Sequence, residues 1–264
     1  MKICICGKGG SGKSTLVALL AGAFARSGKN VIVLDSDESN TSLFWLLGLD
    51  EAPRPLMEIV GGKKAVQQKM LDRFAKGQEE PAMSIWTLTH MASSEIPEAF
   101  FVAGEACKLV VTGKIYQSME GCACPMGAVT REFLKILQLS PDEVALIDME
   151  AGIEHFGRGI EANVDMVIAV AEPSLESAEL AKKVMDLSVS SGAAFGGVVI
   201  NKIADAEQRE HLRHRLSLLS LPVIGIIDHD ASIQTAALEG KPCPETAVDE
   251  LDRIAATLMI DSRG

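Results

Sequence analysis

The chain has 264 residues, of which 47% are apolar and 23% are charged, and its formal net charge is −11. This length and apolar fraction suffice to bury one large core, so we expect a single domain over residues 1–264. The acidic charge disfavours nucleic acid as a partner, because binding to a phosphate backbone requires a basic face. No apolar run approaches the roughly 18 residues that cross a bilayer, and the chain begins directly with a strand pattern. We therefore expect a cytoplasmic protein without a membrane partner, in which the six cysteines bind metal or pack rather than form disulfides.

The first predicted strand covers residues 2–6 and leads into a glycine-rich loop. The loop reads Gly7-Lys8-Gly9-Gly10-Ser11-Gly12-Lys13-Ser14-Thr15 and continues into a helix predicted over 14–26. A G-x-x-x-x-G-K-[ST] pattern between a strand and a helix predicts a nucleoside triphosphate site, because its glycines allow backbone N–H groups to close around phosphate oxygens. Lys13 provides a charge for the β- and γ-phosphates, and the Ser14 hydroxyl can bind Mg²⁺. We expect nucleotide contacts from Gly9, Gly10, Ser11, Gly12, Lys13, Ser14 and Thr15.

Two carboxylates follow the second predicted strand, which covers residues 30–35. Asp35 and Asp37 flank Ser36, and side chains alternate with a period of two in an extended segment, so both carboxylates lie on one side. One can hold a magnesium-bound water while the other positions the water that attacks the terminal phosphate. The simpler alternative is an acidic loop that favours a turn.

Residues 51–121 are divided by prolines and glycines into short pieces, with a helix predicted near 63–75 and strands predicted at 84–88 and 108–112. We expect this stretch to be an elaboration of the same domain that forms partner or dimer surface. It ends in Gly121-Cys122-Ala123-Cys124-Pro125. Two thiolates separated by one residue suit a soft metal ion but supply only half of a tetrahedral site, which a twofold dimer would complete. The alternative is a pair of small buried side chains.

The rest of the chain alternates between predicted strands and helices. Strands are predicted at 144–148, 166–171, 197–201 and 223–227, and helices at 127–138, 174–190, 205–219, 230–239 and 245–259. This order predicts an α/β fold with a doubly wound, mostly parallel sheet flanked by helices, whose ligands collect at the carboxyl ends of the strands. Asp148 ends one such strand, where a carboxylate can reach the magnesium shell. The glycine-rich residues 149–159 have the composition of a switch loop.

The glycine-rich loop with its early lysine resembles that of the deviant Walker A ATPases, a P-loop group that includes cell-division positioning and plasmid-partition ATPases, the nitrogenase iron protein and metallocentre maturation ATPases. The resemblance implies ATP hydrolysis in a homodimer that ATP promotes, with Lys8 reaching the partner's nucleotide; a solvated Lys8 is the alternative. It implies that Asp37 is the hydrolytic aspartate. It further implies that Ser14, Asp35 and Asp148 contact magnesium. Asn201 and Lys202 would contact adenine.

Over nearly its whole length the chain looks most like the CooC-type nickel maturation ATPases of carbon monoxide dehydrogenase and acetyl-CoA synthase. The resemblance rests on residues 8–15, on the Cys-x-Cys with its Pro125, and on residues 148–159. It implies a metallochaperone that binds Ni²⁺ through Cys122 and Cys124 at the dimer interface, where Zn²⁺ can take the same ligands. Delivery to either client enzyme would follow hydrolysis, which loosens the metal site.

Two other classes of function stay open. An iron–sulfur electron donor similar to the nitrogenase iron protein also holds four cysteines between subunits, but that family draws them from separated segments. A cell-division-type positioning ATPase requires a basic amphipathic C-terminal helix for membranes, whereas residues 245–264 are acidic.

Overall fold

A central sheet organises the computed structural model, which describes residues 1–76, 85–114, 124–153, 156 and 159–261. In these residues the sheet has eight strands in the order β10-β9-β8-β1-β7-β2-β5-β4, and every neighbouring pair is parallel except β4 with β5. The strands are β1 (Lys2–Gly7), β2 (Asn30–Asp35), β4 (Val102–Ala103), β5 (Lys108–Val111), β7 (Glu143–Asp148), β8 (Met166–Ala171), β9 (Ala194–Ile203) and β10 (Val223–Asp228). A separate parallel pair joins β3 (Met91–Ala92) to β6 (Leu137–Gln138).

Helices connect the strands and cover the sheet on both faces. The α-helices are α1 (Lys13–Arg26), α2 (Leu43–Leu46), α3 (Leu56–Ile59), α4 (Gly62–Lys76), α5 (Cys124–Ile136), α6 (Leu175–Ser191), α7 (Ala206–Leu218), α8 (Ala231–Leu238) and α9 (Val248–Asp261). Short 3-10 turns occur at Ser93–Glu95, Glu98–Phe100 and Glu161–Asn163. Within the described part of the chain, no helix combines the length and the apolar character that crossing a bilayer requires.

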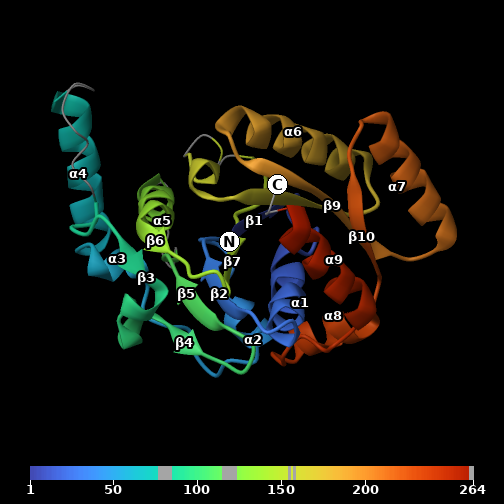
Figure 1. Ribbon diagram of the computed structural model, residues 1–264, viewed down its shortest axis with the longest axis horizontal. Coiled ribbons are helices and arrows are strands. Elements are labelled where there is room, and N and C mark those ends of the chain that lie inside the picture. Colours follow the sequence, from blue (N-terminus) through green and yellow to red (C-terminus); the bar gives the residue numbers. More distant parts are fainter. Residues whose placement is uncertain (77–84, 115–123, 154–155, 157–158, 262–264) are drawn as a thin grey trace.

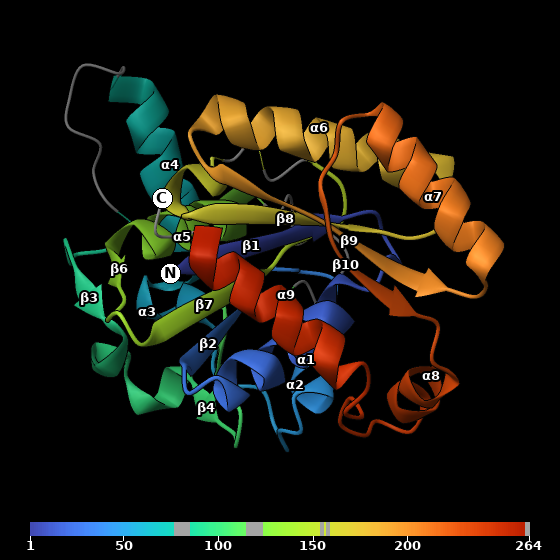
Figure 2. The same ribbon diagram turned by 45° about the vertical axis from the view of Figure 1, so that its right-hand side comes forward.

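The alternation of side chains along β1 divides the core into two layers. Ile3 and Ile5 point to the face that α1 and α9 cover, whereas Cys4 and Cys6 point to the face that α5, α6 and α7 cover. Figure 2 shows α6 and α7 on one side of the sheet and α1 and α9 on the other. These four side chains of β1 are fully buried, as a strand in the middle of a parallel sheet requires. The expected α/β fold with a doubly wound sheet is confirmed.

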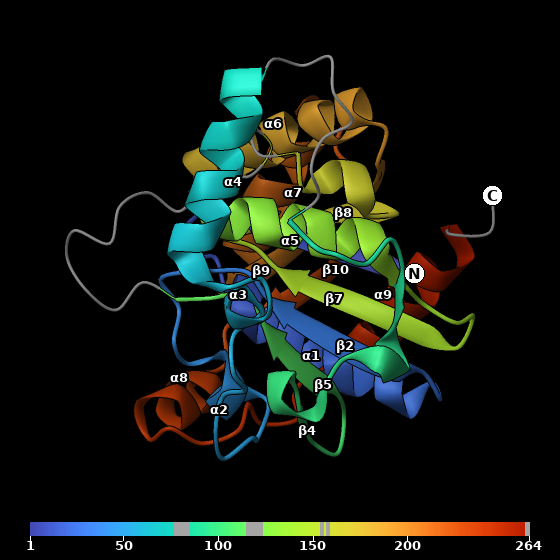
Figure 3. The same ribbon diagram turned by 90° about the vertical axis from the view of Figure 1, so that its left-hand side faces the viewer.

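Residues 51–121 contribute to this sheet and to one end of the molecule. β5 extends the sheet beside β2, and α4 packs against α3 and α5. α4 projects from that end of the molecule, and α5 lies over β7, β2 and β5 (Figures 1 and 3). The helix predicted near 63–75 and the strand predicted at 108–112 are present with slightly different ends.

One predicted element is absent from the structure, and others begin or end at different residues. The strand predicted at 84–88 is wrong, since residues 85–88 form bends and irregular chain. Ile85 and Trp86 are both buried, although neighbouring residues of a strand point to opposite faces, and the Ile85 N–H donates to Glu132 Oε2 at 2.6 Å instead of to a strand. The helix predicted from residue 127 begins earlier, at Cys124, because Pro125 fits the first turn of a helix, where its missing N–H costs nothing.

Candidate functional site

The glycine-rich loop leaves the carboxyl end of β1 and turns sharply into α1. Gly10 and Gly12 have φ angles of 80° and 95°, the left-handed region that favours glycine. A Cβ atom at Gly12 would lie 2.3 Å from Nδ2 of Asn201, so position 12 has no space for a side chain. The Ser11 N–H donates to the Lys8 carbonyl at 3.1 Å and closes the turn. The first N–H groups of α1 therefore face the loop, an arrangement that binds anions.

A cavity of about 480 Å³ lies beside this loop, within the size range of small-molecule sites. Its walls come from residues 9–15, from the segment after β2, and from α2 and α8; they include Gly9, Thr15, Asn40, Trp45, Lys202 and Gln234. A larger cavity of about 790 Å³ lies at the edge of the sheet, between α7, β10 and α9. We assign the nucleotide to the smaller cavity, because residues of the glycine-rich loop and Asp37 line it, whereas neither lines the larger one.

Asp148 ends β7 beside the start of α1 and is fully buried. Its Oδ2 accepts a hydrogen bond from Ser14 Oγ at 2.6 Å, and Ser14 Oγ accepts one from Asn40 Nδ2 at 2.8 Å. Its Oδ1 has no hydrogen-bond partner among the described residues. Burial, with the negative charge of Asp35 nearby, raises the pKa of Asp148 to about 7. A buried carboxylate oxygen without a partner beside a serine hydroxyl fits the oxygen donors that Mg²⁺ prefers.

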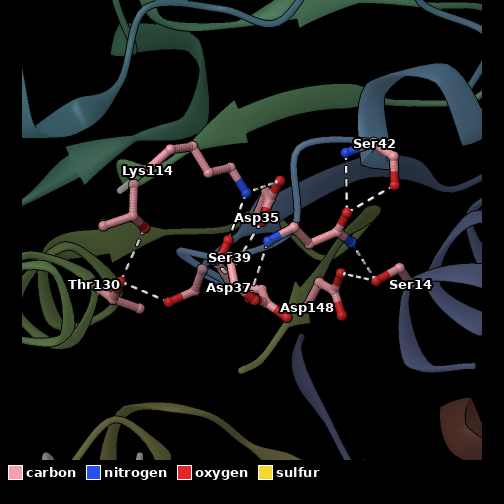
Figure 4. A network of polar contacts seen from close by, with 11 residues as sticks. Ser14, Asp35, Asp37, Ser39, Ser42, Lys114, Thr130 and Asp148 are labelled. Carbon is pink, nitrogen blue, oxygen red and sulfur yellow. Dashed lines mark hydrogen bonds and ion pairs between the residues drawn. The ribbon is translucent and has the colours of Figure 1, made fainter. Parts of the chain in front are cut away.

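Asp35 and Asp37 have different partners although both are buried. Lys114 Nζ donates to Asp35 Oδ2 at 2.6 Å and to the Asp37 carbonyl at 2.6 Å. Burial raises the pKa of Asp35 to about 6, while the Lys114 ammonium opposes that shift. Asp37 Oδ1 accepts hydrogen bonds from the Ser39 N–H at 2.9 Å and from the Ser39 hydroxyl at 2.6 Å. Figure 4 shows both carboxylates within one polar network.

Lys114 and Asn40 belong to this site although no sequence pattern predicted them. Lys114 has the larger set of contacts to the two aspartates. It lies after the carboxyl end of β5, in the strand order next to β2, where ligand-binding groups of a parallel sheet collect. That placement is the one signal that could have identified it, and it becomes visible only once β5 is known to neighbour β2.

Lys8 forms ion pairs within its own chain. Its Nζ lies 2.9 Å from Glu176 Oε2 and 3.4 Å from Glu172 Oε1. Hydrogen bonds to Glu176 and then to Glu172 raise the pKa of Lys8. The reach of Lys8 across a dimer stays a prediction.

Asn201 and Lys202 hold the glycine-rich loop from the end of β9. Asn201 Nδ2 donates to the Ser11 carbonyl at 2.9 Å, and its Oδ1 accepts from the Lys202 N–H at 3.0 Å. Lys202 Nζ donates to the Gly10 carbonyl, and Lys202 has a φ of 62°. Both ends of the Asn201 amide are thus engaged by the protein, and adenine recognition by this pair stays a prediction.

The structure describes the backbone at one of the two cysteines that the sequence predicts as metal ligands. Cys122 lies outside the described residues, and Cys124 is the first residue of α5. Cys4, Cys6 and Cys107 are buried, and burial raises the pKa of the Cys107 thiol to about 12, so these thiols pack in the core. In the described ranges, no three His, Cys, Asp or Glu side chains converge in a way that could hold a metal ion.

Residues 3–243 match the family described as the CobQ/CobB/MinD/ParA nucleotide binding domain, and the chain belongs to this family. It is 40% identical over 241 residues to an uncharacterized ATP-binding protein of Methanocaldococcus jannaschii, covering 91% of this chain and 93% of the relative. It is 33% identical over 247 residues to the carbon monoxide dehydrogenase accessory protein CooC of Rhodospirillum rubrum, covering 92% of this chain and 89% of the relative. The septum site-determining protein MinD of Pyrococcus horikoshii, solved with Mg-ADP, shares the fold with a TM-score of 0.66 and 18% identity, over 97% of this chain and 95% of that one.

Proposed function

We propose that the protein is an ATP-hydrolysing metallochaperone that binds Ni²⁺ through Cys122 and Cys124 of two chains and delivers it to carbon monoxide dehydrogenase or acetyl-CoA synthase. One observation carries the proposal. The helix that begins at Cys124 reaches the nucleotide site directly, because its Thr130 hydroxyl lies 2.8 Å from the hydroxyl of Ser36, between Asp35 and Asp37. The similarity to the CooC protein of Rhodospirillum rubrum over most of both chains supports the proposal.

Residues of the chain can fill each role that ATP hydrolysis requires. The backbone N–H groups of residues 9–13 and the Lys13 ammonium hold the phosphates. Ser14 and Asp148 would hold Mg²⁺ with Asp35 close by, and Mg²⁺ when bound neutralises charge on the transferring phosphate. Asp37, which lines the cavity, positions the attacking water. The relative solved with Mg-ADP shares this fold and supports Mg²⁺ and ATP as the ligands.

The proposed homodimer rests on a metal site that one chain cannot complete. Two thiolates per chain supply half of the four ligands of a closed tetrahedral site, so a second chain supplies the rest. Lys8 lies at the start of the glycine-rich loop. Its ion-pair partners are the partly exposed Glu172 and the exposed Glu176. Because such surface pairs contribute little to stability, Lys8 can exchange them for a partner's phosphate.

The experiment is equilibrium dialysis against Ni²⁺ with MgATP or a non-hydrolysable analogue. We expect one Ni²⁺ for every two chains, and loss of that ion in the Cys122→Ser/Cys124→Ser variant. Cys243→Ser is the matched control and should keep the ion, since its thiol is partly buried with a pKa that burial raises to about 11. Equal Ni²⁺ binding by the wild type and the double-serine variant would disprove the proposal.

The two alternative functions make different predictions. An iron–sulfur donor would contain iron after anaerobic purification, held by cysteine thiolates as a cluster. A cell-division-type ATPase requires a free amphipathic C-terminal helix. Leu251, Ile254 and Leu258 of α9 are buried, and α9 packs on α1 and β10, so the apolar face of this helix belongs to the core.

A further inference from the structure

A buried polar cluster joins α5 and the end of β5 to the loop after β2. It comprises Lys114, Thr112 and Thr130, which together contact Asp35, Ser36 and Asp37. We call these three residues the clamp. None of them lines the cavity assigned to the nucleotide, and all of them are absent from the motifs that predict nucleotide binding. Figure 4 shows the clamp residues Lys114 and Thr130 on the side of the two aspartates away from Ser14.

Lys114 holds both ends of the Asp35-Ser36-Asp37 segment. Its side chain is 6% exposed and that of Asp35 is 4% exposed. One ammonium proton goes to the Asp35 carboxylate and another to the Asp37 carbonyl, each at 2.6 Å. An ammonium has three donors in rotatable directions, so a single lysine can fix a side chain and a main-chain group at once. The two contacts restrain where the Asp37 side chain can point.

The serine between the two aspartates is fixed from α5. Ser36 Oγ and Thr130 Oγ1 lie 2.8 Å apart, and Thr130 Oγ1 lies 2.9 Å from Thr112 Oγ1. All three hydroxyls belong to buried residues. Leaving one of them without a hydrogen bond is costly, so the chain of hydroxyls has a preferred arrangement. A shift of α5 would therefore be opposed by, or transmitted to, Ser36.

We propose that Lys114 is a positioning residue for ATP hydrolysis, and that the clamp makes the placement of Asp37 depend on the position of α5. Lys114 acts through Asp35 and Asp37 and has no contact with the nucleotide cavity. Because α5 begins at Cys124, the same clamp would carry the nucleotide state to the thiol ligands. That second step rests on the proposed function, whereas the positioning role does not.

A purely structural cluster and a positioning clamp differ in kinetics. Loss of a structural contact lowers the fraction of folded protein but leaves the turnover of each folded molecule unchanged. Loss of a positioning contact lowers kcat at an unchanged nucleotide affinity, because the affected interaction acts on the hydrolytic step only. Misplacement of a reacting group by about 1 Å can lower the rate by about a hundredfold.

The hydrolysis experiment compares Lys114→Met and Thr130→Val with the wild type. We expect kcat to fall by about tenfold or more in each, with the Kd of MgATP changed by less than about threefold. Thr130→Ser, which restores a hydroxyl, should recover kcat. Lys108→Met is the matched control. Lys108 is the first residue of β5, its Nζ stacks on Phe101 outside the site, and the variant should behave as the wild type.

Thr130→Val keeps the volume and charge of the site, so it tests the hydroxyl chain even if Lys114→Met does not fold. A kcat within about twofold of wild type in folded Thr130→Val, or equal kcat values in Thr130→Val and Thr130→Ser, would overturn the dependence of Asp37 on α5. A kcat within about twofold of wild type in folded Lys114→Met would overturn the positioning role of Lys114.

Titration with Ni²⁺, with and without a non-hydrolysable MgATP analogue, tests the second step. The nucleotide should change the Ni²⁺ affinity of the wild type and leave that of Thr130→Val unchanged. A nucleotide effect retained in Thr130→Val would overturn transmission through the clamp. If wild-type Ni²⁺ binding does not depend on Cys122 and Cys124, the proposed function and the second step fail together, and the kinetic comparison alone decides on Lys114.

Discussion

Asp148 is the buried carboxyl group with the largest consequence for pH dependence. Its pKa of about 7 in the folded chain lies well above the value of about 4 for an unfolded aspartate. Between these two values the folded chain keeps a proton that the unfolded chain has released. The free energy of unfolding therefore falls, as far as this group is concerned, when the pH rises from about 4 through about 7.

Asp148→Asn should remove this loss. Asparagine keeps an oxygen that can accept from Ser14 Oγ but never ionises. In EDTA and without nucleotide, we expect the variant to melt at a higher temperature than wild type at pH 8, with a gain on the order of a few kcal/mol, and at a similar temperature near pH 4.

Thermal unfolding followed by circular dichroism measures this difference. Asp142→Asn is the control, because hydrogen bonds to its exposed carboxylate, first from Ser140, lower the pKa of Asp142, and its removal should not stabilise the protein. An identical pH dependence in Asp148→Asn and wild type would contradict the account.

The sequence located some residues of the site better than others for a physical reason. Lys13 and Ser14 belong to a local pattern, and Asp35 and Asp148 each end a strand, so the rules of parallel sheets bring them together. Lys114 is 79 positions from Asp35 and belongs to no local pattern. The hydrogen bond from the Asn201 amide to the Ser11 carbonyl joins residues 190 positions apart and likewise belongs to no local pattern. Such pairings depend on tertiary packing that no short pattern encodes.

At the scale of elements, α5 connects the core to the region that carries the Cys-x-Cys. Phe133 of α5 is fully buried and packs against Trp86, with ring centroids 5.5 Å apart. Phe133→Ala should lower the free energy of unfolding by about 3–5 kcal/mol, because a large cavity replaces the ring. Urea unfolding followed by tryptophan fluorescence measures this loss.

Leu238→Ala serves as the comparison, since Leu238 of α8 is 89% exposed, and its effect should stay within about 0.5 kcal/mol. Similar losses in the two variants would show that α5 is not anchored as described.

The elements that the sequence predicted well are those with a long apolar period, such as α6 and the buried strands β1, β2 and β8. Their pattern covers whole elements, so errors were confined to the ends. The prediction failed at 84–88, where the apolar pair Ile85 and Trp86 packs from irregular chain into the core instead of entering a strand. An apolar run this short does not identify a strand by its periodicity alone.

For the whole molecule, the proposed dimer requires Lys8 to leave Glu172 and Glu176. Lys8→Ala should therefore bind the MgATP analogue with an affinity near that of wild type but fail to dimerise. Sedimentation velocity with and without the analogue measures this. Lys29→Ala, a change at a half-buried lysine just before the amino end of β2 and away from the glycine-rich loop, should dimerise normally. Nucleotide-dependent dimerisation of Lys8→Ala at wild-type concentrations would contradict the role of Lys8.

In the proposed dimer, the nucleotide sites and the shared metal site of the two chains depend on each other. The most direct test is the Ni²⁺ affinity of an Asp37→Ala protein, in which hydrolysis is blocked, with and without MgATP. We expect ATP to raise the Ni²⁺ affinity by about tenfold, which corresponds to a coupling free energy of about 1.4 kcal/mol, with one ion per dimer. Equal Ni²⁺ affinities in the nucleotide-free and ATP-bound protein would contradict the account.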